Sequence, residues 1–355
     1  MLPALAQDLH STITGTGLAV TFYVIPYGLF QLLYGPLGDR SGKVAVVRWA
    51  VLLFALGTGL CAVVNGLPML YFLRAATGAC AAAVIPLALA YIGDVVPYRQ
   101  RQAAIAGLMG FTALGNVLST AVGGIVGNFL SWRALFALYG VCSLAVTLLL
   151  FRVPADRQTG QTRDSASYGE RYLAVLRAPR ARHLYALVAL EGVLVTGGFT
   201  YLGAYLRARF GISYLAIGLI LACYAGGTLG ISRFVLRPQR WRIREVTMVV
   251  TGGICLGGGF IFLFLLPTAL LAPLPILLMG VGFALFHSTL QTRATELLPA
   301  RRGTAVALFA FSLFLGGGIG TAALGGVLTF SGYPLLLGIS GVGMLLVTLN
   351  ARLAW

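Results

Sequence analysis

Long apolar runs separated by short polar connections make up most of the chain. A membrane-spanning helix needs about 20 mostly apolar residues, and runs of that length recur over the whole sequence. The pattern predicts an all-α membrane protein, because the weak alternating signal of a membrane β-barrel is not seen. We predict eleven spans, at 11–34, 44–63, 68–94, 101–127, 133–152, 183–206, 212–232, 246–266, 273–297, 303–329 and 333–352.

An internal repeat indicates that the chain has two related halves. When the sequence is shifted by 202 positions, residues 94–99 (DVVPYR) fall on 296–301 (ELLPAR), and Gly123-Gly124 falls on Gly325-Gly326. Parallel repeats of this kind relate the two halves of many transporters. One polar connection, 153–182, is predicted to be a cytoplasmic linker between an N-terminal bundle, 1–152, and a C-terminal bundle, 183–355.

The distribution of charged residues predicts how the chain is oriented in the membrane. Of the 355 residues 59% are hydrophobic and 10% are charged, and the net charge is +16. A basic chain can bind nucleic acid, but here nearly all cations fall in alternate loops, such as those with Arg40, Arg99 and Arg301. This positive-inside pattern places these loops and the C-terminus in the cytoplasm. It predicts a multi-pass membrane protein, with the lipid bilayer as a partner and no nucleic acid.

The first basic loop, residues 35–43 (GPLGDRSGK), carries the most specific motif. Its glycines permit close backbone approach and positive φ, and a carboxylate among cations can face a helix N-terminus. The Gly-x-x-x-Asp-Arg-x-Gly-Lys pattern resembles the signature loop of the major facilitator superfamily, which joins the second and third helices on the cytoplasmic side. The resemblance implies a gate formed by Gly35, Gly38, Asp39, Arg40, Gly42, Lys43 and Asp94.

Two contacts of this gate follow from the same resemblance. Asp39 is expected to face the N-terminus of the helix that begins near Gly303, where the helix dipole favours an anion. Arg40 is expected to pair with Asp94 at the end of a neighbouring helix. Both contacts are expected to form in one state of the protein and to break in the other. The alternative is that these charges only set the membrane topology.

The resemblance also implies a plan of six and six helices, of which eleven are found. The span at 183–206 has no counterpart at the offset of 202, and residues 2–9 resemble the segment that follows the first helix of family members. We therefore expect the first helix to be absent from this sequence. A non-transporting fragment is accordingly one alternative function.

Arg74 and Glu191 are the charged residues that lie well inside predicted spans, away from the span ends. A charge at the centre of a membrane helix costs roughly 2.5–3.5 kcal/mol on insertion scales, so each is expected to face a partner or a water-filled cavity. Arg74, with Gly78 four residues later, resembles a helix-four motif associated with proton or substrate coupling. Glu191 is the only carboxylate well inside an apolar span, and it is predicted to carry a proton. Snorkelling of Arg74 to the membrane surface and a permanently neutral or paired Glu191 are the alternatives.

Uncharged polar residues supply further candidates. His287 and Gln291 are four positions apart and share one face of a helix, so either is a candidate for proton or substrate binding. Asn116 is a weaker candidate of the same kind. A purely structural role is the alternative for each of them.

Residues 293–303 (RATELLPARRG) look like the corresponding segment of the bacterial drug:proton antiporter branch of the family. The resemblance implies proton-coupled efflux of a small amphipathic molecule by alternating access. Family antiporters carry Gly-Pro-x-x-Gly-Gly in helix five, whereas residues 119–124 (STAVGG) keep only the two final glycines. A uniporter or symporter of the same fold is therefore the other alternative.

Other classes of function find no support in the sequence. The five cysteines stand singly in apolar runs, so neither a metal site nor a disulfide framework is predicted. The glycine runs 257–259 and 316–318 lack the context of phosphate loops and are predicted to be close-packing surfaces. We expect no enzyme activity, no cofactor, and a monomer that is driven by a proton gradient.

Overall fold

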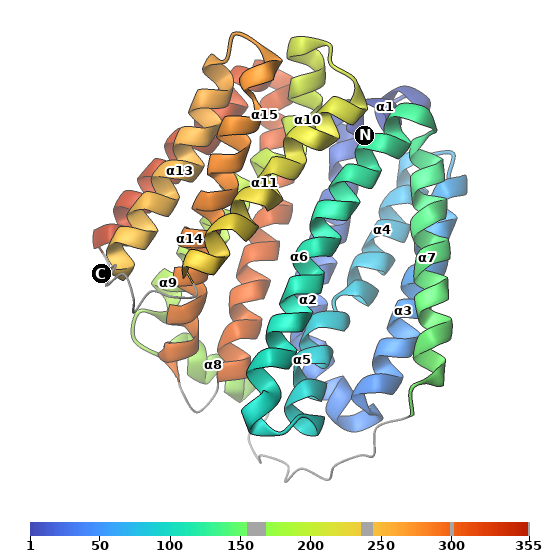
Figure 1. Cartoon of the computed structure of the whole chain (residues 1–355), viewed down its shortest axis with the longest axis vertical. Coiled ribbons are helices and arrows are strands. Elements are labelled where there is room, and N and C mark those ends of the chain that lie inside the picture. Colours follow the sequence, from blue (N-terminus) through green and yellow to red (C-terminus); the bar gives the residue numbers. More distant parts are fainter. Residues whose placement is uncertain (155–167, 236–243, 299–301, 354–355) are drawn as a thin grey trace.

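The computed structural model describes residues 1–154, 168–235, 244–298 and 302–353 (Figure 1). In these ranges the elements are helices and there is no strand, as predicted. Ten helices are long and apolar enough to cross a membrane. The last of them, Arg302–Arg352, covers two predicted spans, and Gly332 breaks it between them with a φ of +75°. All eleven predicted spans therefore fall on helices.

Most of the helices belong to one of two consecutive sets along the chain. The first half contains α1 (Leu2–Asp8), α2 (Ile13–Ser41), α3 (Lys43–Leu60), α4 (Leu67–Ala81), α5 (Val84–Val95), α6 (Tyr98–Phe129) and α7 (Trp132–Arg152). The second half contains α9 (Ala181–Glu191), a π-helical turn (Gly192–Thr196), α10 (Gly197–Phe210), α11 (Tyr214–Val235), α13 (Glu245–Leu265), α14 (Pro273–Leu297) and α15 (Arg302–Leu353). Between the halves, α8 (Tyr168–Arg177) is a helix within the predicted linker, of which residues 155–167 lie outside the described ranges.

Helix boundaries repeat between the two halves at the offset found in the sequence. Helix α3 begins at Lys43 and α13 at Glu245, and α5 ends at Val95 and α14 at Leu297. Each pair is 202 positions apart. The fold thus consists of two pseudo-symmetric helical bundles, and the repeat in the sequence reflects a repeat in the structure.

One element departs from this symmetry. Helix α1 ends at Asp8 and α10 ends at Phe210, again 202 positions apart, so the short α1 corresponds to the last turns of α10. At this offset, the positions that match α9 and the π-helical turn would lie before Met1.

The halves meet mainly at the end of the bundle that is far from the arginine-rich loops. There α6 and α11 converge (Figure 1), and a Cβ on Gly124 would lie 2.9 Å from the Cα of Gly218. Helix α2 packs along α15, and Thr21 donates a hydrogen bond of 3.0 Å to the carbonyl of Gly318. These backbone approaches require small residues, which explains the glycines at the contact.

Toward the arginine-rich end, α6 and α11 diverge (Figure 1). On that part of α6 the Phe111 side chain is 76% exposed. A Cβ on Gly107 or Gly110 would meet no heavy atom within 4 Å outside its own helix. The structure is therefore closed at one end between α6 and α11 and open at the other.

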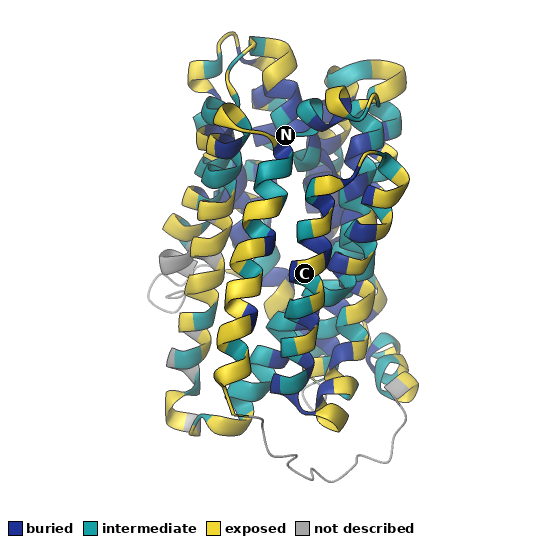
Figure 2. Cartoon of the chain, turned by 90° about the vertical axis from the view of Figure 1, so that its right-hand side faces the viewer, coloured by how far each residue is buried: buried dark blue, intermediate teal, exposed yellow. Residues whose placement is uncertain are grey.

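The outer faces of the bundle are apolar and exposed. On α7, Val141, Leu148 and Leu149 are all at least 60% exposed, and Figure 2 shows exposed positions along the outer helices. In water such a surface is unfavourable, whereas lipid chains solvate it. The fold therefore requires a bilayer around it.

Candidate functional site

Most of the predicted loop 35–43 is helical in the structure, because α2 continues to Ser41, Gly42 alone forms the turn, and α3 begins at Lys43. Gly42 has a φ of +84°, a conformation that glycine adopts without a steric penalty. A Cβ on Gly38 would lie 2.4 Å from Cδ2 of Leu87 on α5, whereas a Cβ on Gly35 would meet nothing within 4 Å. Gly42 and Gly38 thus shape and seat the loop, and packing in this state does not require Gly35.

Lys43 is the cation at the centre of the loop's ion pairs. It is 8% exposed, and its Nζ lies 2.6 Å from Oδ2 of Asp94 and 3.6 Å from Oδ1 of Asp39. The resemblance predicted an ion pair between Arg40 and Asp94, but in the structure the cation that pairs with Asp94 is Lys43. The reason is that Lys43 begins α3, which packs against α5, the helix that carries Asp94.

The predicted contact between Asp39 and the start of α15 is not made in this structure. The Asp39 side chain is 53% exposed and pairs with Lys43 of its own half. A Cβ on Gly303 would meet no heavy atom within 4 Å outside its own helix. This arrangement agrees with an interface that is open at the arginine-rich end.

Glu191 and His287 form a buried pair in the second half. Glu191 is 0% exposed, and its two carboxylate oxygens lie 3.2 and 3.3 Å from Nδ1 of His287. The His287 ring stacks on Phe283, with centroids 4.6 Å apart, and meets the edge of Phe309 at 4.9 Å. The structure thus brings together two of the residues that the sequence proposed for proton binding.

Close helix packing positions Glu191. It is the last residue of α9 and precedes the π-helical turn, a feature that is frequent at functional sites. A Cβ on Gly192 would lie 2.2 Å from the carbonyl oxygen of Leu313, and a Cβ on Gly316 would lie 2.0 Å from that of Ala189. These contacts hold the end of α9 against α15. For Gly316, the predicted close-packing role is confirmed.

The chemistry of the pair is that of a shared proton. A buried carboxylate is costly unless it is paired. If Glu191 is ionised, Nδ1 of His287 must carry the proton of the hydrogen bond, and if Nδ1 is unprotonated, the carboxyl group must carry it. The His287 side chain is 17% exposed, so its ring is the part of the pair that solvent can reach.

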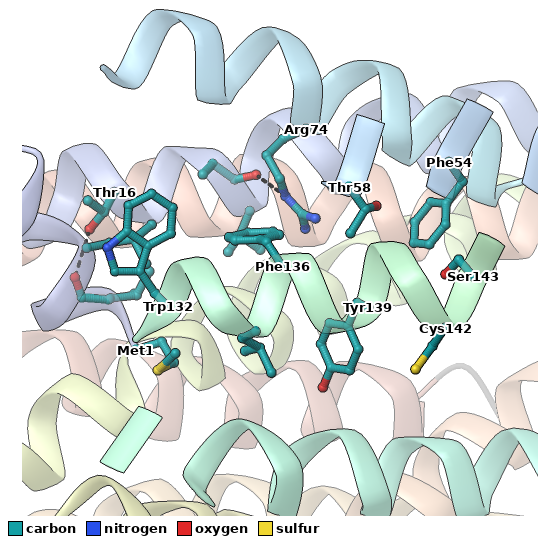
Figure 3. Close-up of a pocket in the computed structure, with 15 residues that line it drawn as sticks. Met1, Thr16, Phe54, Thr58, Arg74, Trp132, Phe136, Tyr139, Cys142 and Ser143 are labelled. Atoms are coloured by element: carbon teal, nitrogen blue, oxygen red, sulfur yellow. Dashed lines mark hydrogen bonds between the residues drawn. The ribbon is translucent and has the colours of Figure 1, made fainter. Parts of the chain in front are cut away.

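Arg74 lies in the first half, apart from this pair. It sits on α4 and lines a cavity of about 440 Å³ (Figure 3). Its Nε donates to the Ala19 carbonyl at 3.5 Å, and its Cζ lies 4.0 Å from the centre of the Tyr23 ring. Within the described residues, no carboxylate is within ion-pairing distance of Arg74. The sequence predicted that this charge faces either a partner or a cavity, and in the structure it faces a cavity.

Gln291 and Asn116 are not brought into the Glu191–His287 pair. Gln291 is exposed on α14, one turn from His287, and Asn116 is exposed on α6 in the other half. Sequence reasoning missed the polar lining of the Arg74 cavity, including Thr58. It also missed the contacts of Asp8, which accepts a hydrogen bond from Trp132 Nε1 and pairs with Arg133. The signal for that cluster is Arg133, one of the few cations in the sparsely charged loops.

Two helical bundles related by a repeat, with a buried carboxylate–histidine pair between helices, are typical of a membrane transporter. The model of the family described as Major Facilitator Superfamily matches residues 1–321. The chain belongs to this superfamily, so the resemblance seen in the signature loop is confirmed.

Similar proteins were found by sequence and by structure. The uncharacterized MFS-type transporter YceJ of Bacillus subtilis is 25% identical over 332 residues, which cover 92% of this chain and 83% of that protein. A chloramphenicol resistance protein of Pseudomonas aeruginosa is 26% identical over 334 residues, which cover 90% of this chain and 77% of that protein. The crystal structure of a mutant of the nucleoside transporter NupG superposes with a TM-score of 0.82 at 16% identity, covering 99% of this chain and 93% of that one.

Proposed function

We propose that this protein is a proton-coupled transporter that exports a small amphipathic molecule by alternating access. The proposal rests on the Glu191–His287 pair, in which a fully buried carboxylate contacts the ring nitrogen Nδ1 of a partly exposed histidine. A coupling site must hold a proton in one state and release it in another. A carboxylate within hydrogen-bonding distance of a histidine ring can share a proton with it.

The signature loop supports the gating part of the proposal. Lys43 joins Asp39 and Asp94 within the first half, while Asp39 is half exposed at the open end of the interface. When the halves close at that end, Asp39 becomes free to meet the N-terminus of α15, where the helix dipole favours an anion. The ion pairs of the loop then differ between the two states, as a gate requires.

Export of amphipathic molecules is supported by the similarity to a chloramphenicol resistance protein. The basic loops and the C-terminus are proposed to lie in the cytoplasm, from the positive-inside pattern, and the protein is proposed to act as a monomer in a bacterial cytoplasmic membrane. The open end of the structure is then the cytoplasmic end, where an exported molecule enters.

A uniporter or symporter is the second candidate. The observation that favours it is the absence of the Gly-Pro pair from helix α6, where residues 119–124 read STAVGG. The fold is compatible with this alternative, because it is also that of a nucleoside transporter.

Transport by the protein in a drug-hypersensitive bacterium separates these candidates. We expect lower accumulation of chloramphenicol or of another amphipathic antibiotic in expressing cells, and loss of the difference when a protonophore collapses the gradient. Higher accumulation in expressing cells would support a symporter. An export that survives the protonophore would contradict proton coupling.

A further inference from the structure

The linker helix α8 is packed on the second half of the molecule. Val175 and Leu176 follow Tyr172 by three and four positions, so the three side chains share one face of this helix. Val175 is fully buried in the hydrophobic core of the second half, and Tyr172 and Leu176 pack against that core. Helix α8 contacts α9 and α15, and Figure 1 shows it at the arginine-rich end of the bundle. It is therefore expected to move with the second half.

One side chain of α8 reaches across to the first half. The Tyr172 hydroxyl donates a hydrogen bond of 2.9 Å to the backbone carbonyl of Leu32 on α2, and the two residues are 140 positions apart in the chain. A carbonyl inside an α-helix normally accepts a hydrogen bond from the N–H four residues later. For Leu32 that residue stands at position 36.

Position 36 explains why a side chain from the other half bonds to this carbonyl. Pro36 lies inside α2, and proline has no backbone N–H to donate. The carbonyl of Leu32 therefore lacks its usual helical partner, and a backbone carbonyl away from water is costly to leave unpaired. The Tyr172 hydroxyl takes the place of the missing N–H. Pro36 belongs to the signature loop 35–43, at a position that the loop's pattern leaves open.

This hydrogen bond lies close to the proposed gate. Asp39 follows Leu32 by seven positions, which is about two helical turns of α2. In this structure the side chain of Asp39 is half exposed and the arginine-rich end is open. Closure of that end is proposed to bring Asp39 to the start of α15, on which α8 packs. An O–H···O hydrogen bond spans only about 2.5–3.0 Å, so a shift of about 1–2 Å between the helices breaks it.

We infer that Tyr172 is a positioning residue of the gate. Its hydroxyl holds the Leu32–Pro36 turn of α2 against the second half while the arginine-rich end is open. It releases that turn when the end closes. The inference rests on the alternating access proposed above and is independent of the proton site at Glu191.

Electron–electron double resonance in nanodiscs measures the opening of the arginine-rich end. Spin labels are attached to p-acetylphenylalanine introduced in place of Gly110 on α6 and Gly230 on α11, which leaves the five native cysteines unchanged. Both glycines are exposed, and a Cβ on either would meet no heavy atom within 4 Å outside its own helix. Without substrate, we expect a longer distance from the open state and a shorter one from the closed state. Tyr172→Phe is expected to lower the ratio of open to closed molecules about 3- to 10-fold, because it removes a hydrogen bond from the open state alone.

A second substitution tests the role of the proline. Pro36→Ala supplies the Leu32 carbonyl with a backbone N–H in both states. Adding Tyr172→Phe to Pro36→Ala is therefore expected to change the ratio by less than about twofold. The matched control is Tyr185→Phe. The Tyr185 hydroxyl also donates to a backbone carbonyl, that of Ala305 at 3.1 Å, but both residues lie in the second half, so the ratio is expected to stay unchanged.

Three results would overturn the inference. They are a wild-type ratio in Tyr172→Phe, equal shifts in Tyr172→Phe and Tyr185→Phe, and an effect of Tyr172→Phe that is the same with and without Pro36→Ala. In the last case the hydroxyl would not replace the missing N–H. Two distances in the wild-type protein would still support alternating access in each of these cases. One unchanging distance in every variant would contradict both the inference and the alternating access.

Discussion

Several helix boundaries repeat between the two halves of the molecule, but the charge inside each half has different surroundings. In the second half α9, the π-helical turn and α10 fill the centre, and Glu191 is enclosed there with His287 as its partner. In the first half Arg74 lines a cavity, and no carboxylate of the described residues is within ion-pairing distance of it. The comparison teaches that a repeated backbone does not fix the surroundings of the charges that it carries. The proton site proposed at Glu191 therefore has no counterpart among the described residues around Arg74.

Removing the charge of Glu191, which pairs with His287, is the change with the largest expected effect on transport. Glu191→Gln keeps the shape and much of the hydrogen bonding but cannot titrate. We expect it to abolish proton-driven accumulation in proteoliposomes while sparing downhill exchange. Glu245→Gln is the control, because this exposed acid pairs with Arg293 near the arginine-rich end. A Glu191→Gln protein that still accumulates its substrate would move the proton site elsewhere.

The close packing that holds the pair can be broken without touching it. Gly316→Ala places a Cβ 2.0 Å from the backbone oxygen of Ala189, and overpacking of this kind costs typically about 1–3 kcal/mol. We expect a lower thermal unfolding midpoint in detergent and a weakened proton response. On the same helix, a Cβ on Gly338 would meet no heavy atom within 4 Å, so Gly338→Ala is expected to leave both unchanged. Equal effects of the two substitutions would contradict the packing account.

A substitution in the proposed gate is expected to have a smaller effect on transport. Asp39→Asn removes a charge–dipole contact expected in the closed state, which is worth about 0.3–2 kcal/mol. The transport rate is therefore expected to fall by roughly 2- to 30-fold, with normal insertion in the membrane. Cysteine accessibility at the two ends of the bundle is expected to shift toward the state open at the arginine-rich end. An unchanged rate and accessibility would reduce Asp39 to a topology signal.

Much of the fold could be predicted from the sequence, because apolar length alone specifies membrane helices. The break at Gly332 could be placed between two spans for the same reason. The partner of Asp94 could not be predicted, because Arg40 and Lys43 are both basic. Only the turn at Gly42 and the packing of α3 on α5 select Lys43. A cavity beside Arg74 was one of the two expectations from its charge, but the residues that line the cavity, such as Thr58 and Trp132, could not be predicted, because they depend on how the helices pack.

For the Glu191–His287 pair, the sequence supplied both residues but not their contact. Glu191 was conspicuous as a carboxylate in an apolar span, and His287 as a polar residue on a helix 96 positions further along the chain. Nothing in either helix's own pattern indicates that α9 and α14 bring the two side chains together. Only tertiary packing, including the glycine contacts between α9 and α15, sets the distance of 3.2 Å.

The central claim is that Glu191 takes up and releases a proton, and infrared difference spectroscopy during a pH change tests it most directly. In nanodiscs the wild-type protein is expected to gain the C=O stretching band of a protonated carboxylic acid on acidification, and to lose it again at higher pH. The band is expected to be absent from Glu191→Gln and present in Glu245→Gln. A wild-type spectrum with no band that Glu191→Gln removes, over the pH range in which transport responds, would contradict the account.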